Sequence, residues 1–179
     1  MKNRLFFLLL ISSALLSSQG VWTLKSPLPA TGRWTGFSFS IGTNGYVTTG
    51  YTGSNSLNDL WEWDQLTDTW AVKTNIGGSA RFASAGFVIG NKAYVGNGAA
   101  NTSGSLLNDW WEFDPATNTW TQKANYAGGP RAYSESFAIG LKGYVMGGLS
   151  YSPTVYYSDF WEFDPVSNNW VSKANFPGG

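Results

Sequence analysis

The chain matches itself at a period of about fifty residues, and this repetition constrains the fold more than any other feature. The segment DLWEWD at 59–64 recurs as DWWEFD at 109–114 and as DFWEFD at 159–164. Each segment is followed at a fixed distance by a Trp and then a Lys, and each of the three units opens with an Arg, at positions 33, 81 and 131. Repeats of this length that are built from short strands indicate a radial array of small sheets rather than a helical solenoid.

Each unit contains the signals of four short strands. In the third unit these lie at 134–139, at 143–146, at 160–164 and from Trp170 onward. The last two are joined by the turn Asp164-Pro165-Val166-Ser167-Asn168, in which Pro fixes φ, the Asp side chain caps amides, and Asn tolerates the left-handed region. Strands separated by turn signals about every ten residues predict an all-β, antiparallel fold without helices.

The repeated positions resemble the kelch-repeat family. The third unit has the full pattern, with Tyr144 on the second strand, the pair Gly147-Gly148 after it, and Trp170 leading the fourth strand. The first two units depart at the double Gly, where Thr49-Gly50 and Asn97-Gly98 stand. The resemblance covers 21–179 and implies an exported, bacterial-type kelch β-propeller with one four-stranded antiparallel blade per unit. It also implies a distant similarity to the propeller of galactose oxidase, and kelch scaffolds host oxidases, mutarotases and binding modules.

The unit boundaries predict an incomplete ring. We place blades at 33–80, 81–130 and 131–179, the last including the start of a further repeat, and an orphan fourth strand within 21–32. Propellers typically need four to eight blades, so three cannot close a ring. We expect a fragment of a ring of six or seven blades, whose remaining blades would be partners within the same chain. A natural half-propeller that assembles by oligomerisation is the alternative.

The N-terminus has the order of elements found in a secretory signal peptide. Lys2 and Arg4 precede an apolar run at 5–16, and the small residues Ser18 and Gly20 stand at −3 and −1 of a cut before Val21. The run is too short to span a bilayer comfortably. We therefore expect 1–20 to be removed and the mature protein to be secreted, periplasmic or at the cell surface, without a stable membrane anchor.

Charge and composition exclude several classes of function. The whole chain is neutral, with eleven Lys and Arg against eleven Asp and Glu, so no basic footprint for nucleic acid exists. It contains no Cys and no His, which removes thiol chemistry, the commonest metal ligand and the commonest general base. The copper ligands of galactose-oxidase-like kelch enzymes are therefore missing from this stretch. We expect no cofactor and no metal.

Most acidic residues recur in every unit and are interpreted as scaffold. Asp64, Asp114 and Asp164 are predicted turn caps, and Glu62, Glu112 and Glu162 are predicted partners of Lys73, Lys123 and Lys173 across a hairpin. Arg33, Arg81 and Arg131 enter the innermost strands, where they either form a ligand-binding ring at the channel mouth or pair with Asp59, Asp109 and Asp159.

Two features break the repetition and are candidates for binding. Glu135 replaces Phe37 and Ala85 of the other units, either as a ligand contact or as part of a local ion pair, for instance with Arg131. The loops at 51–58, 99–108 and 149–158 vary most, and the third contains Tyr151, Tyr156 and Tyr157, which suit stacking on sugars or peptides. These tyrosines can equally pack on their own blade.

Two functions of different class follow from these observations. The first is a binding module without chemistry of its own, which presents variable loops and a channel mouth to a protein or carbohydrate ligand. The second is part of an exported sugar-active enzyme of the oxidase or mutarotase type, with its active-site residues in blades beyond this stretch. The absence of His and Cys favours the binding module.

Overall fold

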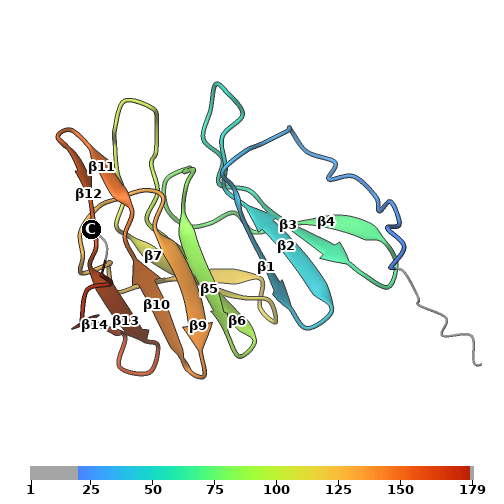
Figure 1. The fold of residues 1–179 in the computed structure, drawn as a ribbon. Helices are drawn as coiled ribbons and strands as arrows, with labels where there is room; N and C mark the ends of the chain where they lie inside the picture. The colour runs from blue at the N-terminus through green and yellow to red at the C-terminus, as the bar shows by residue number, and fades with distance from the viewer. Residues whose placement is uncertain (1–19, 178–179) are drawn as a thin grey trace, which may run out of the picture.

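The computed structural model describes residues 20–177, which form three four-stranded sheets and one small hairpin (Figure 1). The expected signal peptide lies outside the described residues except for Gly20. Within 20–177, no helix is long and apolar enough to cross a membrane.

Each sheet is antiparallel and follows the order of the chain. The first sheet contains β1 (Phe37–Ile41), β2 (Asn44–Thr48), β3 (Leu60–Asp64) and β4 (Thr69–Lys73). The second contains β5 (Ala85–Ile89), β6 (Lys92–Gly96), β7 (Trp110–Asp114) and β8 (Thr119–Lys123). The third contains β9 (Glu135–Ile139), β10 (Lys142–Met146), β13 (Phe160–Asp164) and β14 (Asn169–Lys173). The predicted four strands per unit are confirmed.

The remaining strands, β11 (Leu149–Tyr151) and β12 (Thr154–Tyr156), form a hairpin within the third loop. The first strands of the three sheets, β1, β5 and β9, are neighbours in space, and the fourth strands β4, β8 and β14 lie at the outer edges (Figure 1). The sheets therefore fan out from a common inner side, as blades of a propeller do.

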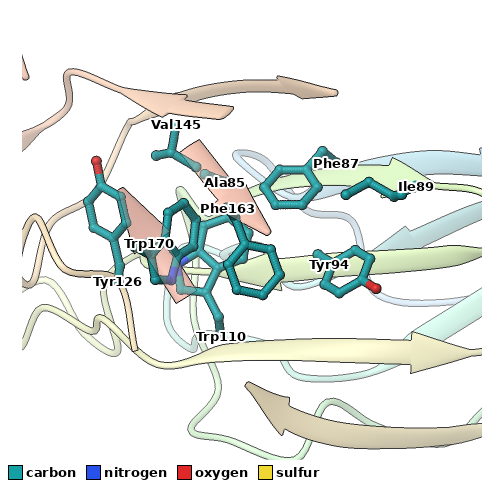
Figure 2. Close-up of a cluster of buried hydrophobic side chains, with 9 residues drawn as sticks. All are labelled: Ala85, Phe87, Ile89, Tyr94, Trp110, Tyr126, Val145, Phe163 and Trp170. Carbon is teal, nitrogen blue, oxygen red and sulfur yellow. The ribbon is translucent and has the colours of Figure 1, made fainter. Parts of the chain in front are cut away.

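The second and third sheets are joined by an apolar interface (Figure 2). Phe87 of β5 projects onto Gly143 of β10, where a Cβ atom would lie 2.1 Å from its ring. The ring centroid of Phe87 is 6.3 Å from that of Phe163, and Trp110 lies edge-on to Trp170 at 5.1 Å. Because Gly143 has no side chain, the ring of Phe87 fits against the backbone of β10. The second and third sheets can therefore approach closely where β5 faces β9 and β10.

The first and second sheets use the same arrangement with different side chains. Tyr46 of β2 lies 5.8 Å from Phe113 of β7, between ring centroids, and both are buried with Leu60 and Ala93. Ala93 stands where Gly143 stands in the next unit, and Leu60 where Trp110 stands. The two interfaces are thus the same contact formed twice, which explains why the aromatic positions recur in the sequence.

The turns after β3, β7 and β13 are capped as predicted. The carboxylates of Asp64, Asp114 and Asp164 accept backbone N–H groups two residues on, at 2.7, 2.9 and 3.0 Å. The residues that close these turns, Asp68, Asn118 and Asn168, have φ between 52° and 54°. Asp and Asn tolerate this left-handed conformation better than most side chains do.

The segment 21–25 differs from the prediction, because it forms no strand in the structure. A strand needs a neighbouring strand for its hydrogen bonds, and Trp22 is 99% exposed. The following residue, Ser26, nevertheless keeps its repeat position. Its carbonyl accepts Trp70 Nε1 at 2.9 Å, as the carbonyl of Thr74 accepts Trp120 Nε1 at 2.8 Å. The segment around Ser26 therefore lies against the first sheet in the same way as the segment around Thr74, which follows β4, lies against the second sheet.

Candidate functional site

The three variable loops project from the same end of the sheets (Figure 1). Each loop is closed by a backbone hydrogen bond that repeats from unit to unit, Leu57 to Gly50, Leu107 to Gly98 and Tyr157 to Gly148. Neighbouring loops also touch, since Ser56 Oγ donates to the carbonyl of Ala100 at 2.8 Å. We call the surface formed by 51–58, 99–108 and 149–158 the loop face.

The loop face is uncharged. None of the three loops contains Asp, Glu, Lys or Arg, whereas Ser, Thr, Asn, Gly and Tyr predominate. The opposite ends of the sheets differ sharply, because Asp64, Asp114 and Asp164 all lie there, and Lys92 and Lys142 pair with the latter two. Loops rich in Tyr, Ser, Gly and Asn are also typical of the binding loops of antibodies.

Aromatic side chains border the loop face on its inner side. Tyr51 packs against Trp34 and Phe82, with ring centroids 5.7 and 5.1 Å apart. Trp34 is 54% exposed, an unusually large apolar surface for a side chain at a repeated position. Sequence reasoning did not single out Trp34, although its place directly after a repeat Arg was visible in the sequence.

A cavity of about 170 Å³ opens between the first two loops. It is lined by Tyr51 and by residues 54–56 and 100–102. Every lining side chain is a hydroxyl, an amide, a methyl or the Tyr ring. The variability of these loops was the sequence signal for this site, but the cavity arises only because the two loops lie side by side.

A second cavity of about 370 Å³ lies on the last sheet, lined by residues 133, 135, 146–149, 156, 157 and 176. The corresponding residues of the second unit include Ala83, Ala85 and Ala99, all buried. There the third sheet covers them, with the N–H of Tyr133 donating to the carbonyl of Ala83 at 3.1 Å. This cavity therefore lies on the face of the third sheet that is equivalent to the covered faces of the first and second sheets. In those two units the next sheet along the chain packs against that face.

The three repeat arginines pair with aspartates, the second of the two arrangements considered above. The two Nη atoms of Arg81 donate to the carboxylate of Asp109, at 2.8 and 2.7 Å. Arg33 bonds Asp59 in the same way, at 2.6 and 2.7 Å. Arg131 bonds Asp159, and it also contacts the carbonyls of Gly147 and Gly128.

The aspartates of these pairs accept hydrogen bonds from tryptophans as well. Trp111 Nε1 donates to Asp109 at 2.6 Å, and Trp61 and Trp161 donate to Asp59 and Asp159. Burial tends to raise the pKa of Asp109, but the hydrogen bonds and charge of Arg81 and the bond from Trp111 outweigh it and lower that pKa. Because Arg81 and Arg131 are fully buried, their guanidinium groups stabilise the blades and offer no surface at the channel mouth.

The repeated glutamates are paired with lysines as predicted. Lys73 lies 3.3 Å from Glu62, Lys123 lies 3.3 Å from Glu112, and Lys173 lies 2.9 Å from Glu162. The structure adds a tyrosine that sequence reasoning missed, since Tyr46 donates to Glu62 at 2.6 Å and Tyr144 to Glu162 at 3.0 Å. Tyr46 stands opposite Glu62 in the β2–β3 pair, and Tyr144 stands opposite Glu162 in the β10–β13 pair. This cross-strand register was the signal from which the Tyr–Glu bonds could have been predicted.

The tyrosines of the third loop have different environments. Tyr151 is partly buried against the cluster formed by Phe82, Ala83, Ala99 and Ala132, and burial together with a hydrogen bond to Tyr133 raises its pKa to about 12. Tyr157 lies under the guanidinium of Arg131, 3.8 Å from its ring centroid. Tyr156 is 79% exposed and is the member of the three that is free to contact a ligand.

Glu135 is exposed on the wall of the second cavity. It forms no ion pair within residues 20–177, so the local pairing with Arg131 that we considered is not present there. The described residues also contain no group of three acidic residues close enough to hold a metal ion.

Three fanned, four-stranded antiparallel sheets with aromatic contacts between them define a segment of a β-propeller. A family model described as the KLHDC2/KLHL20/DRC7 Kelch-repeats domain matches residues 23–176. The chain therefore belongs to this kelch-repeat family, and the resemblance noted in the sequence is confirmed.

Solved structures support the same fold. The chain is similar to the structure of YjhT, with a TM-score of 0.75 and 18% sequence identity over 89% of this chain and 57% of that chain. At this identity the likeness shows the fold alone, and the chain spans a little over half the length of YjhT. A search of curated proteins found no match.

Proposed function

We propose that this protein is an exported kelch-repeat binding module, which holds a protein or carbohydrate ligand on its loop face and performs no chemistry of its own. The observation that carries the proposal is the contrast between the two ends of the sheets. The turns at one end contain capping aspartates, two of which pair with lysines, whereas the three adjoining loops at the other end vary in length and contain no charged residue. Variable loops on a rigid scaffold are the usual place for specificity.

The repeat arginines and glutamates support the proposal indirectly. Each is paired within its own blade, so these repeated charged residues are accounted for as scaffold, and Glu135 is not among them. The loop face is what varies between units, and exposed aromatic surface is present on it at Tyr156 and at its border at Trp34. Aromatic side chains of this kind contribute large contact areas at interfaces.

The proposal is tested with the purified protein labelled for fluorescence and applied to an array of neutral and anionic glycans and to a displayed peptide library. A matched variant replaces loop 99–108 by a Gly/Ser linker of equal length. A control variant carries Asn91→Ala, in the β5–β6 turn at the opposite end of the same sheet. Saturable binding that is lost with the loop replacement and kept in the control supports a binding module. Binding that survives the replacement, or turnover of an arrayed sugar, overturns it.

Export is part of the proposal and has its own test. Expression of the full coding sequence should yield a mature protein that begins at Val21 and is found outside the cytoplasm. Intact protein beginning at Met1 in the cytoplasmic fraction would contradict it.

A further inference from the structure

The cavity between the first two loops is small, uncharged and bordered by an aromatic ring. At about 170 Å³ it is smaller than the sites that hold drug-sized ligands. Its walls offer Tyr51, hydroxyl groups and amide groups, and neither loop contains a charged residue. A ligand that enters must therefore be small, neutral and rich in hydrogen-bonding groups, because a charged group would lose its hydration without gaining a counter-charge.

Internal hydrogen bonds fix the shape of both loops. Thr52 Oγ1 accepts the N–H of Asn55 at 3.1 Å, and Asn101 Oδ1 accepts the N–H groups of Ser103 and Ser105 at 3.1 and 3.3 Å. The Ser56–Ala100 bond then ties the two loops together across the cavity. Loops that are already ordered lose little further conformational entropy when a ligand binds.

Other polar side chains on the cavity wall have no partner within the described residues. The hydroxyls of Ser54 and Thr102 and the amide of Asn55 take part in no side-chain hydrogen bond there. Hydroxyls and amides can each donate and accept. The cavity therefore presents solvent-exposed donors and acceptors that are not used within the protein, beside an aromatic ring.

We infer that this cavity binds one unit of a neutral glycan, an inference that rests on the proposed binding function of the loop face. Each sugar hydroxyl both donates and accepts, which matches the free groups of Ser54, Asn55 and Thr102. The apolar face of a sugar ring suits Tyr51, whose orientation is set by Trp34 and Phe82. Trp34, exposed beside Tyr51, provides a second platform for the next unit of the same glycan.

The test uses saturation-transfer NMR and calorimetry with four neutral disaccharides: maltose, cellobiose, lactose and chitobiose. Glucuronate and galacturonate serve as anionic comparators. Sugars are used at concentrations of about ten millimolar, above the millimolar Kd expected of a weak site. The double variant Asn55→Ala/Thr102→Val removes two free polar groups without touching the bonds that shape the loops. Asn91→Ala is the control, and thermal unfolding of all variants verifies that they remain folded.

The expected result is saturable binding of at least one neutral disaccharide, weakened about tenfold or more in the double variant and unchanged in the control. Loss of two hydrogen bonds of ordinary strength accounts for a change of this size. Quenching of tryptophan fluorescence by the same sugar, abolished by Trp34→Ala, identifies the second platform.

The inference is overturned if the double variant binds as the parent does, if the uronates bind as well as the neutral sugars, or if no sugar binds. In each case the array experiment separates the two proposals. Peptide binding that depends on loop 99–108 would leave the binding module standing and remove only the glycan site. Loss of every loop-dependent interaction would remove both.

Discussion

The middle and the last sheet present Phe and Ile at equivalent positions of the same face, but only the middle one is covered within residues 20–177. Phe87 of β5 is 4% exposed beneath the third sheet, whereas its counterpart Phe137 of β9 is 37% exposed. Ile89 of β5 is likewise buried, whereas its counterpart Ile139 of β9 is exposed. The sequence pattern thus encodes an interface at each unit, and the presence of a neighbouring sheet decides whether that surface is buried.

The backbone shows the same difference. The N–H of Gly50 donates to the carbonyl of Arg81 at 2.9 Å, and that of Gly98 to Arg131 at 2.8 Å. Gly148 occupies the equivalent position in the last unit and makes no such bond within residues 20–177. Each covered face is therefore tied to its neighbour by polar bonds as well as by apolar packing.

The largest effect is expected at the buried charge pair within the middle blade. Asp109→Ala leaves the guanidinium of the fully buried Arg81 without its counter-ion and should lower the free energy of unfolding by about 3–5 kcal/mol. Glu135→Ala, on the open face, should change it by less than about 0.5 kcal/mol. Equal losses in chemical denaturation would show that the comparison between covered and open faces is wrong.

Truncation of the two equivalent phenylalanines comes next. Phe87→Ala creates a cavity between two sheets and should cost about 3 kcal/mol, whereas Phe137→Ala should cost about 1 kcal/mol, since its ring is already part-hydrated. Both losses are measured by the shift in denaturant midpoint, provided that the dependence of the unfolding free energy on denaturant concentration is the same in each variant. A loss at Phe137 as large as that at Phe87 would indicate that the last sheet is covered in solution, for example by a second copy, which light scattering would reveal.

A smaller effect is expected from adding a methyl group at the closest approach of the sheets. Gly143→Ala places a Cβ atom against the ring of Phe87 and should cost about 1–3 kcal/mol through overpacking. Gly45→Ala is the matched control, because no sheet precedes the first one within residues 20–177 and the nearest neighbour of Gly45 is Trp63 at 3.6 Å. We expect the control to be neutral or slightly stabilising. Destabilisation of both variants would point to the strands themselves rather than to the contact between sheets.

The smallest predicted effect is the loss of unfolding free energy that each arginine-paired aspartate causes when it is protonated at low pH. The pKa of Asp59 and that of Asp109 are lowered because donors from Arg and Trp outweigh burial. A carboxylate with a depressed folded-state pKa stabilises the fold fully above its unfolded pKa, near 4, and loses that contribution as the pH falls further. The free energy of unfolding should therefore be nearly constant from about pH 6 to 5 and decline below about pH 4. Asp109→Asn should flatten this decline, and an unchanged pH profile in that variant would contradict it.

Much of the fold could be predicted from the sequence because it is repeated. The three four-stranded units, the capped turns at Asp64, Asp114 and Asp164 and the Glu–Lys pairs all follow from local signals of strand alternation and turn chemistry. The kelch pattern added the arrangement of the units. These features depend on residues a few positions apart or on facing strands, so the sequence alone constrains them.

The site was less predictable. The loop face was expected from its variability, yet the sequence pointed to Tyr151 and Tyr157, which turn out to pack against the scaffold, and missed Trp34 and Asn55. The choice between a ring of free arginines and Arg–Asp pairs also stayed open in the sequence. Both questions depend on which side chains meet across separate units.

The sequence by itself determined that the chain repeats, where its strands and turns lie, and that it lacks His, Cys and charged loops. Only the tertiary structure decided that Arg81 is enclosed with Asp109, that 21–25 is not a strand, and that two loops enclose a cavity. The physical reason is that strands and turns are stabilised by neighbours along the chain or in one sheet. Burial, ion pairing and cavities depend on the distances between sheets, and one glycine such as Gly143 can set such a distance.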